Sequence, residues 1–242
     1  MNLYQEMIID HSRDPRGWDD NPQGDCAEGH NPMCGDQIKI CVDMEDGVIK
    51  KVRFKGHGCS LSVAAASVLS EISVGWSYDV FCENMAQYLS MLKDRPYEDL
   101  PTKLKVFSEV GKYPMRVKCV TFAWHALKEA MQPLCLSDSI KGYWMELVEE
   151  KNALGIEIGF KQTGCFGWQY VSSILFEEKV GATCYQYGSL NIYIQDDVVS
   201  KVQGTKVDYI QEDLGQSKVL YQHPNIQERC GCGESFVIEE VV

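Results

Sequence analysis

The sequence predicts an α+β protein of two domains, the first with a small antiparallel sheet that carries helices and the second rich in β-strands. Its 242 residues exceed the roughly 100 to 150 of a common domain, so two modest cores are favoured over one large core. Helical spacing dominates after Phe54, whereas strand-like alternation dominates from Ala153 onward. We place the domains at residues 1–135 and 139–242, because a helix ends before Pro133 and a new amphipathic pattern follows.

The first domain is predicted to open with a helix, a loop and a β-hairpin. Residues 3–11 show helical spacing, and residues 13–33 are crowded with Gly, Pro, Asp and Asn, which predicts a long loop. Apolar and polar side chains alternate over residues 37–44. A Glu-Asp-Gly turn follows, and a second strand-like run covers residues 48–54. The two runs therefore form a hairpin.

Helices follow the hairpin. The stretch KGHGCSLSVAAASVLSEI changes from strand-like to helical, so Cys59 is expected at a helix start. Prolines separate the later helices from one another. Helices are predicted over residues 78–93, 102–110, 115–131 and 140–151, and strands over residues 154–160 and 190–194.

Charge and hydropathy exclude several classes of function. The formal charge of −12 repels phosphate backbones and anionic lipid, so neither nucleic acid nor a membrane surface is expected as a partner. No apolar run approaches the roughly 20 residues of a membrane-spanning helix, and the N-terminus lacks the pattern of a signal peptide. We expect a soluble, cytoplasmic protein that binds other proteins.

The cysteine content indicates metal or sulfur chemistry. Eleven cysteines make an odd count in a chain too long for the small disulfide-stapled class, so we expect reduced thiols in a reducing compartment. Cys34 and Asp36 lie before the hairpin, and Cys59 and Cys119 are expected near helix starts, where the thiolate is favoured. Three thiolates and one carboxylate suit zinc or an iron-sulfur cluster, with the harder oxygen as the more labile ligand. Cys34, on an exposed loop, is the candidate sulfur acceptor.

The first 130 residues resemble a known family. The stretches LYQEMIIDHSRDPR, NPMCGD, VRFKGHGCSLSVAAASVLSE and YPMRVKCVTFAWHAL together resemble the U-type scaffolds of iron-sulfur cluster assembly. Lys118 stands where the IscU branch has a histidine, and the LPPVK motif is absent, so the sequence is closer to the SufU branch. The resemblance implies a zinc site at Cys34, Asp36, Cys59 and Cys119 that accepts sulfur from a cysteine desulfurase.

The second domain holds another set of thiols. Cys165 lies in TGCFG, and Cys230 and Cys232 form a C-x-C pair near the chain end, where two thiolates can serve one metal or two adjacent irons. The CGCGESF ending and the upstream Gly-Cys loop resemble the A-type carriers of the HesB, IscA and SufA family, although Phe166 replaces the usual serine. The resemblance implies that Cys165, Cys230 and Cys232 hold iron or a [2Fe-2S] or [4Fe-4S] cluster at a subunit interface, and hence a homodimer or larger homo-oligomer.

The remaining thiols have no accompanying motif and are interpreted as buried or incidental. These are Cys26, Cys41, Cys82, Cys135 and Cys184. His57 is interpreted as an electrostatic neighbour of Cys59, with metal ligation as the less favoured alternative.

Together these patterns lead to one main hypothesis and two alternatives. The main hypothesis is iron-sulfur cluster assembly: sulfur enters at Cys34, and clusters are carried onward to recipient apo-proteins. The first alternative is a zinc-dependent persulfide sulfurtransferase that acts with a cysteine desulfurase. The second is a structural metal-binding interaction protein. A scaffold or carrier is favoured over a classical enzyme.

Overall fold

The computed structural model describes residues 3–32, 34–45, 47–162, 168–211, 217–223, 226–229 and 236–238. The chain divides into two compact units, Met1–Met131 and Gln132–Val242. Within the described ranges, no helix combines the length and the apolar character needed to cross a membrane. Mixed helices and strands in the first unit and a strand-rich second unit confirm the predicted α+β class.

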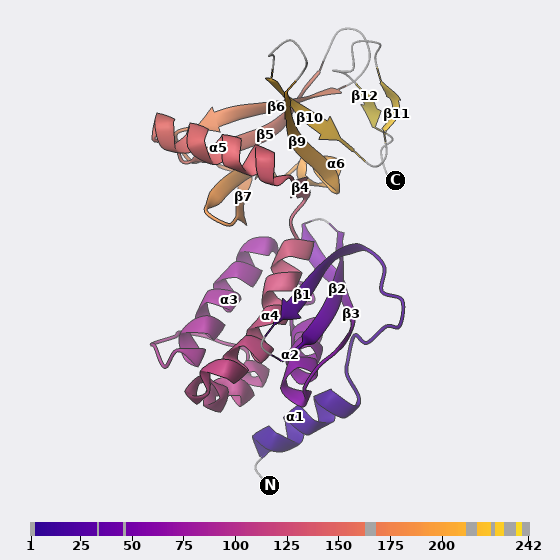
Figure 1. Ribbon diagram of the computed structural model, residues 1–242, viewed down its shortest axis with the longest axis vertical. Helices are drawn as coiled ribbons and strands as arrows, with labels where there is room; N and C mark the ends of the chain where they lie inside the picture. Colours follow the sequence, from indigo (N-terminus) through magenta and orange to yellow (C-terminus); the bar gives the residue numbers. More distant parts are fainter. Residues whose placement is uncertain are drawn as a thin grey trace. The chain divides into compact units, whose positions relative to one another are not determined.

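The first unit contains the predicted hairpin within a three-stranded antiparallel sheet of order β1-β2-β3 (Figure 1). Strand β2 spans Asp36–Glu45 and β3 spans Val48–His57, and the alternation of their side chains buries one face against helices. Gly47 adopts a φ of +73° in the connecting turn, a conformation that glycine reaches without steric cost.

Strand β1, Asp25–Asn31, lies within the segment that the sequence predicts as a loop. Its composition is polar and includes Gly29, so neither propensity nor alternation identifies it. It forms because it pairs antiparallel with β2, and because α4 packs against it. A Cβ at Gly29 would lie 2.9 Å from Ile38 Cγ2 and 3.0 Å from a ring carbon of Phe122, so a larger residue would force these side chains to shift.

Helices cover one face of the sheet, with α2 and α4 packed against its strands (Figure 1). Three successive buried alanines in α2 let it lie close to β3, α1 and α4. Trp124 of α4 is buried and stacks on Tyr88 at a ring-centroid distance of 5.0 Å. The helices are α1 Leu3–Arg13, α2 Ser60–Ile72, α3 Tyr78–Leu92 and α4 Pro114–Ala130, with a 3₁₀ helix, η1, over Thr102–Lys112.

The expectation of reduced thiols throughout is wrong for one pair. Cys26 of β1 and Cys41 of β2 face each other in the sheet register and form a disulfide, with their Cα atoms 4.1 Å apart. The sequence could not reveal this pairing, because it depends on the unpredicted strand β1. The disulfide also explains why Cys41 is buried on a face of β2 whose other residues are exposed or half-buried.

A buried histidine links α1 to α2. His11 has 3% of its surface exposed, and its Nδ1 lies 2.7 Å from Ser67 Oγ. Burial lowers the pKa of His11, aided by Arg16 and Lys103 and opposed by Glu71 and Asp10.

The lowered pKa of His11 predicts a pH dependence of stability. The unfolded chain takes up a proton near pH 6.5 while the folded chain resists it, so the free energy of unfolding should fall as the pH drops from 7.5 towards 5. Urea denaturation at both pH values measures the change. A His11→Gln variant should show a shallower decrease, and an equal decrease in both proteins would contradict the assignment.

The second unit is built mainly of strands (Figure 1). One sheet has the order β10-β9-β4 and the other β11-β12-β6-β5-β8-β7, with parallel pairing between β4 and β9 and between β5 and β8. Ser137 caps α5, Asp138–Lys151, by accepting a hydrogen bond from the Ile140 amide. The strands are β4 Leu134–Leu136, β5 Gly155–Gln162, β6 Trp168–Leu175, β7 Ala182–Tyr187, β8 Leu190–Gln195, β9 Thr205–Gln211, β10 Ser217–Gln222, β11 Ile226–Arg229 and β12 Phe236–Ile238, with a short helix α6 at Val199–Val202.

Candidate metal and sulfur site

The turn between β1 and β2 presents Cys34 and Asp36. The register pairs Asn31 with Asp36, and the Asn31 carbonyl accepts hydrogen bonds from the amides of Cys34 and Gly35 at 3.3 and 2.9 Å. Gly35 adopts a φ of +75°, which glycine reaches without strain. The turn leaves Cys34 exposed and Asp36 buried, with 4% of the aspartate surface exposed.

Cys59 occupies the junction between β3 and α2. It is the N-cap residue of α2, with the extended backbone typical of that position, and its side chain is exposed. The preceding Gly58 passes close to Asp36, because a Cβ at Gly58 would lie 2.9 Å from Asp36 Cγ. A larger residue there would push the two ligand-bearing segments apart.

Cys119 reaches the same place from α4. Its side chain has 6% of its surface exposed, and its Sγ accepts a hydrogen bond from Asn31 Nδ2 at 3.4 Å. The Sγ atoms of Cys34 and Cys119 lie 3.8 Å apart. Segments about 85 residues apart in sequence therefore meet at this point.

Three candidate ligands form a tight group. One ligand atom each from Cys34, Asp36 and Cys119 lies within 4.8 Å of the others. Cys59 joins them through its contacts with Asp36 and Cys119 and lines the same open pocket, of about 470 Å³. The pocket is lined by Cys34, Cys59, Ser60, Leu61, Met115, Arg116 and Cys119.

The electrostatics of Cys119 differ from the prediction. Burial, together with the neighbouring thiols of Cys59 and Cys34, raises the pKa of the Cys119 thiol to about 12. Cys119 is the sixth residue of α4 and not at its N-terminus, so the predicted stabilisation of its thiolate by the helix end is wrong. Its thiolate needs a compensating cation.

The carboxyl group of Asp36 is held in its charged form. Burial by itself would raise the pKa of Asp36, but hydrogen bonds from Ser62, from the Cys34 thiol and from Cys59 outweigh burial and lower it. The buried anion and the three surrounding thiols have the composition of a four-ligand zinc site. The residues thus fit a divalent metal with soft ligands.

The thiols predicted for the second site, Cys165, Cys230 and Cys232, lie outside the described residues, as does Phe166. Of the cysteines interpreted as incidental, Cys82, Cys135 and Cys184 are not disulfide-bonded, whereas the disulfide corrects the interpretation of Cys26 and Cys41.

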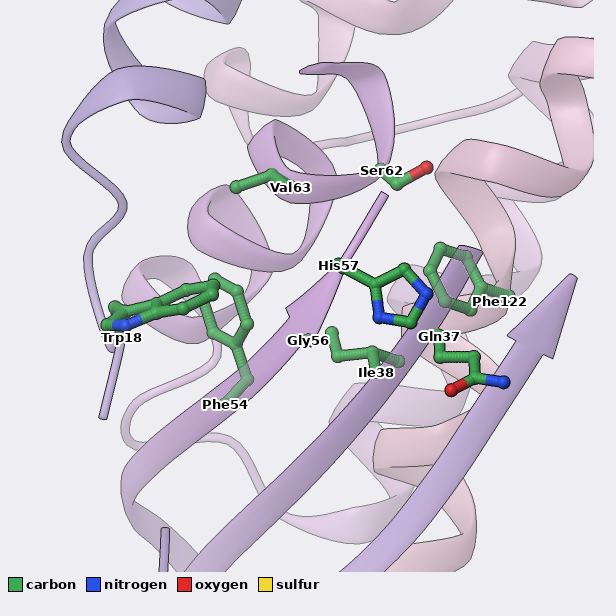
Figure 2. A pocket seen from close by; sticks show the side chains of 9 residues that line it. All are labelled: Trp18, Gln37, Ile38, Phe54, Gly56, His57, Ser62, Val63 and Phe122. Atoms are coloured by element: carbon green, nitrogen blue, oxygen red, sulfur yellow. The ribbon is translucent and has the colours of Figure 1, made fainter. Parts of the chain in front are cut away.

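His57 faces a different, small pocket between β3 and α2. Figure 2 shows its imidazole turned towards Phe122, with Trp18 lying against Phe54 on the other side. The Trp18 and Phe54 rings are edge to face at a centroid distance of 5.6 Å, so this region is an apolar packing contact.

Sequence reasoning missed two polar neighbours of the candidate ligands, Asn31 and Ser62. Asn31 contacts Cys119, and Ser62 contacts both Asp36 and Cys59. The position of Ser62, three residues after an N-cap, was the available signal, because side chains at these two positions face each other.

A family model, the NifU-like N terminal domain, matches residues 3–135, which include all four candidate ligands. The chain belongs to this family. A zinc-dependent sulfurtransferase SufU of Bacillus subtilis is 28% identical over 131 residues, covering 53% of this chain and 89% of that protein. An iron-sulfur cluster assembly scaffold protein IscU of Thermotoga maritima is 33% identical over 135 residues, covering 54% of this chain and 94% of that protein.

A different set of relatives matches the other part of the chain. The iron-sulfur cluster assembly protein SufA of Escherichia coli is 31% identical over 116 residues, covering 48% of this chain and 88% of that protein. The predicted fusion of a U-type unit with an A-type unit is therefore confirmed.

Proposed function

We propose that this protein assembles and carries iron-sulfur clusters, with sulfur entering at the first unit and clusters leaving from the second. The convergence of Cys34, Asp36 and Cys119 within 4.8 Å carries the proposal, with Cys59 as the fourth ligand. Relatives of the first unit are named as a scaffold and a sulfurtransferase, and a relative of the second as an assembly protein.

Zinc is the metal that we propose for the resting first site. Three thiolates and one carboxylate match the tetrahedral preference of zinc, and the SufU relative is named as zinc-dependent. When bound, zinc would supply the positive charge that lets buried thiolates persist. The hard oxygen of Asp36 would by itself be the more labile ligand, but Asp36 is buried and hydrogen-bonded by Ser62, so we propose that it and the buried Cys119 act as anchors. The exposed Cys34 is then the ligand free to leave.

Cys34 then accepts sulfur by thiol–persulfide exchange. Its thiolate attacks the outer sulfur of a persulfide on a cysteine desulfurase, a new S–S bond forms at Cys34, and the old S–S bond breaks. The desulfurase cysteine departs as a thiolate, so sulfur moves without net oxidation. The open pocket around Cys34 provides room for the donor.

For the second unit we propose that Cys165, Cys230 and Cys232 hold a [2Fe-2S] or [4Fe-4S] cluster for transfer to apo-proteins. Three thiolates leave coordination positions open, which favours a site shared between two copies of the chain. A cytoplasmic location stays a prediction from the sequence, and the Cys26–Cys41 disulfide weighs against it.

The proposal is tested on anaerobically purified full-length protein by zinc, iron and acid-labile sulfide analysis and by visible absorption. We expect Cys34→Ala to lose zinc and the ability to take up sulfur from a desulfurase, and Cys232→Ala to lose iron and sulfide. Unchanged metal content in both variants would favour a structural role. Iron and sulfide lost with Cys34→Ala would instead assign a cluster scaffold to the first unit.

A further inference from the structure

Ser62 contacts two of the candidate ligands at once. Its hydroxyl donates a hydrogen bond to Oδ2 of Asp36, and its Oγ lies 3.2 Å from the Sγ of Cys59. Only 2% of its surface is exposed. A buried side chain therefore joins the aspartate of β2 to the cysteine at the start of α2.

The helix geometry explains how one residue reaches both. Cys59 is the N-cap of α2 and Ser62 is its third helical residue, so their side chains lie on the same side of the first turn. Figure 2 shows the Ser62 hydroxyl directed away from the pocket that holds Trp18 and Phe54. The Ser62 hydroxyl instead donates its hydrogen bond to Asp36.

Other buried serines of α2 have different partners. Ser67 Oγ lies 2.7 Å from His11 Nδ1 and accepts from the Arg16 amide at 2.8 Å, while Ser70 donates to the Arg16 carbonyl at 2.8 Å. These contacts tie α2 to the N-terminal segment. Ser62 differs because its contacts are with the metal and sulfur site.

The surroundings of Asp36 make its orientation depend on such a contact. Gly58 closes one side of the carboxyl group, where even a Cβ would approach to 2.9 Å. A carboxylate has two oxygens, and a hydrogen bond that occupies one of them leaves the other for a metal. Without the bond from Ser62, the contacts with Cys34 and Cys59 alone would decide which of the two oxygens the carboxylate presents to a metal.

We propose that Ser62 is a positioning residue that orients the Asp36 carboxylate for monodentate metal binding and keeps Cys59 beside it. The inference rests on the proposed metal site. Partners of this kind, bonded to a ligand and not to the metal, alter metal affinity by about 10- to 100-fold when removed. Ser62 thereby couples the start of α2 to the oxygen ligand.

The test uses full-length Ser62→Ala, Ser62→Thr and Ser70→Ala proteins. Zinc affinity is measured by competition with a chromophoric chelator, and ligand geometry by the absorption bands of cobalt(II) bound in place of zinc. We expect Ser62→Ala to bind zinc about 10- to 100-fold more weakly with shifted cobalt bands. Ser62→Thr keeps the hydroxyl, so its zinc affinity and cobalt bands should match those of the wild type. Ser70→Ala, the matched control, should lower stability and leave both unchanged.

A double-mutant cycle shows whether Ser62 acts through Asp36. In an Asp36→Ala background, adding Ser62→Ala should weaken zinc binding little further, because the bonded oxygen is already gone. An equal loss in both backgrounds, or Ser62→Ala with wild-type affinity and spectrum, would overturn the inference. If Cys119→Ala also kept full zinc affinity, the proposed metal site itself would be wrong. The Cys119→Ala protein therefore distinguishes a failure of the Ser62 inference from a failure of the metal site.

Discussion

Replacing Cys119 with alanine should abolish retention of zinc by the first unit. Cys119 is the buried ligand, 3.8 Å from the Cys34 sulfur, and its thiol has a pKa of about 12 in the absence of a cation. Its deprotonation is tied to metal binding, since a thiolate in this position is otherwise disfavoured. Because loss of an indirect partner already costs about 10- to 100-fold in affinity, loss of a direct ligand should cost more than about 100-fold.

Zinc content after purification and a chelator competition measure this effect. Cys82→Ala provides a matched control, because Cys82 of α3 is half-buried, is not disulfide-bonded and lies outside the candidate ligands. We expect the control to retain zinc. If Cys119→Ala retained zinc equally well while circular dichroism showed a folded protein, Cys119 would not be a ligand.

Breaking the Cys26–Cys41 disulfide should lower the free energy of unfolding of the first unit by about 3 kcal/mol. The bond joins residues 15 apart in sequence, and a loop of that length restricts the unfolded chain by about this amount in the chain-entropy model. The pair also holds β1, whose sequence alone favours a loop, in register with β2.

Urea denaturation with and without a phosphine reductant, followed by tryptophan fluorescence, measures the stabilisation. A Cys26→Ala/Cys41→Ala protein should match the reduced wild type and should not respond to the reductant. Identical transitions of oxidised and reduced wild-type protein would contradict the prediction.

The disulfide should have little influence on zinc affinity. In the register it lies five residues along β1 from the pair Asn31 and Asp36, at the far end of the shared strand segment. We therefore expect reduction of the Cys26–Cys41 disulfide to lower the free energy of unfolding while zinc stays bound. This result would distinguish the disulfide cysteines from the metal ligands.

Local patterns in the sequence were sufficient for the hairpin and the main helices. Alternation over residues 37–44 reports a sheet face, and the glycine-rich change of pattern at Cys59 reports a helix start, because both depend on near neighbours. Motif resemblance similarly selected the candidate ligands before any distance was known. The presence of an A-type unit also followed from its sequence motifs.

The sequence by itself determined the α+β class, the two families and the candidate ligands, since each is carried by local periodicity or by short motifs. The tertiary structure decided which distant groups meet. Strand β1 and its disulfide depend on pairing with β2, and β4 depends on a parallel partner, β9, far along the chain. The raised pKa of Cys119 and the bond from Ser62 to Asp36 arise from burial and contact, which no local pattern encodes.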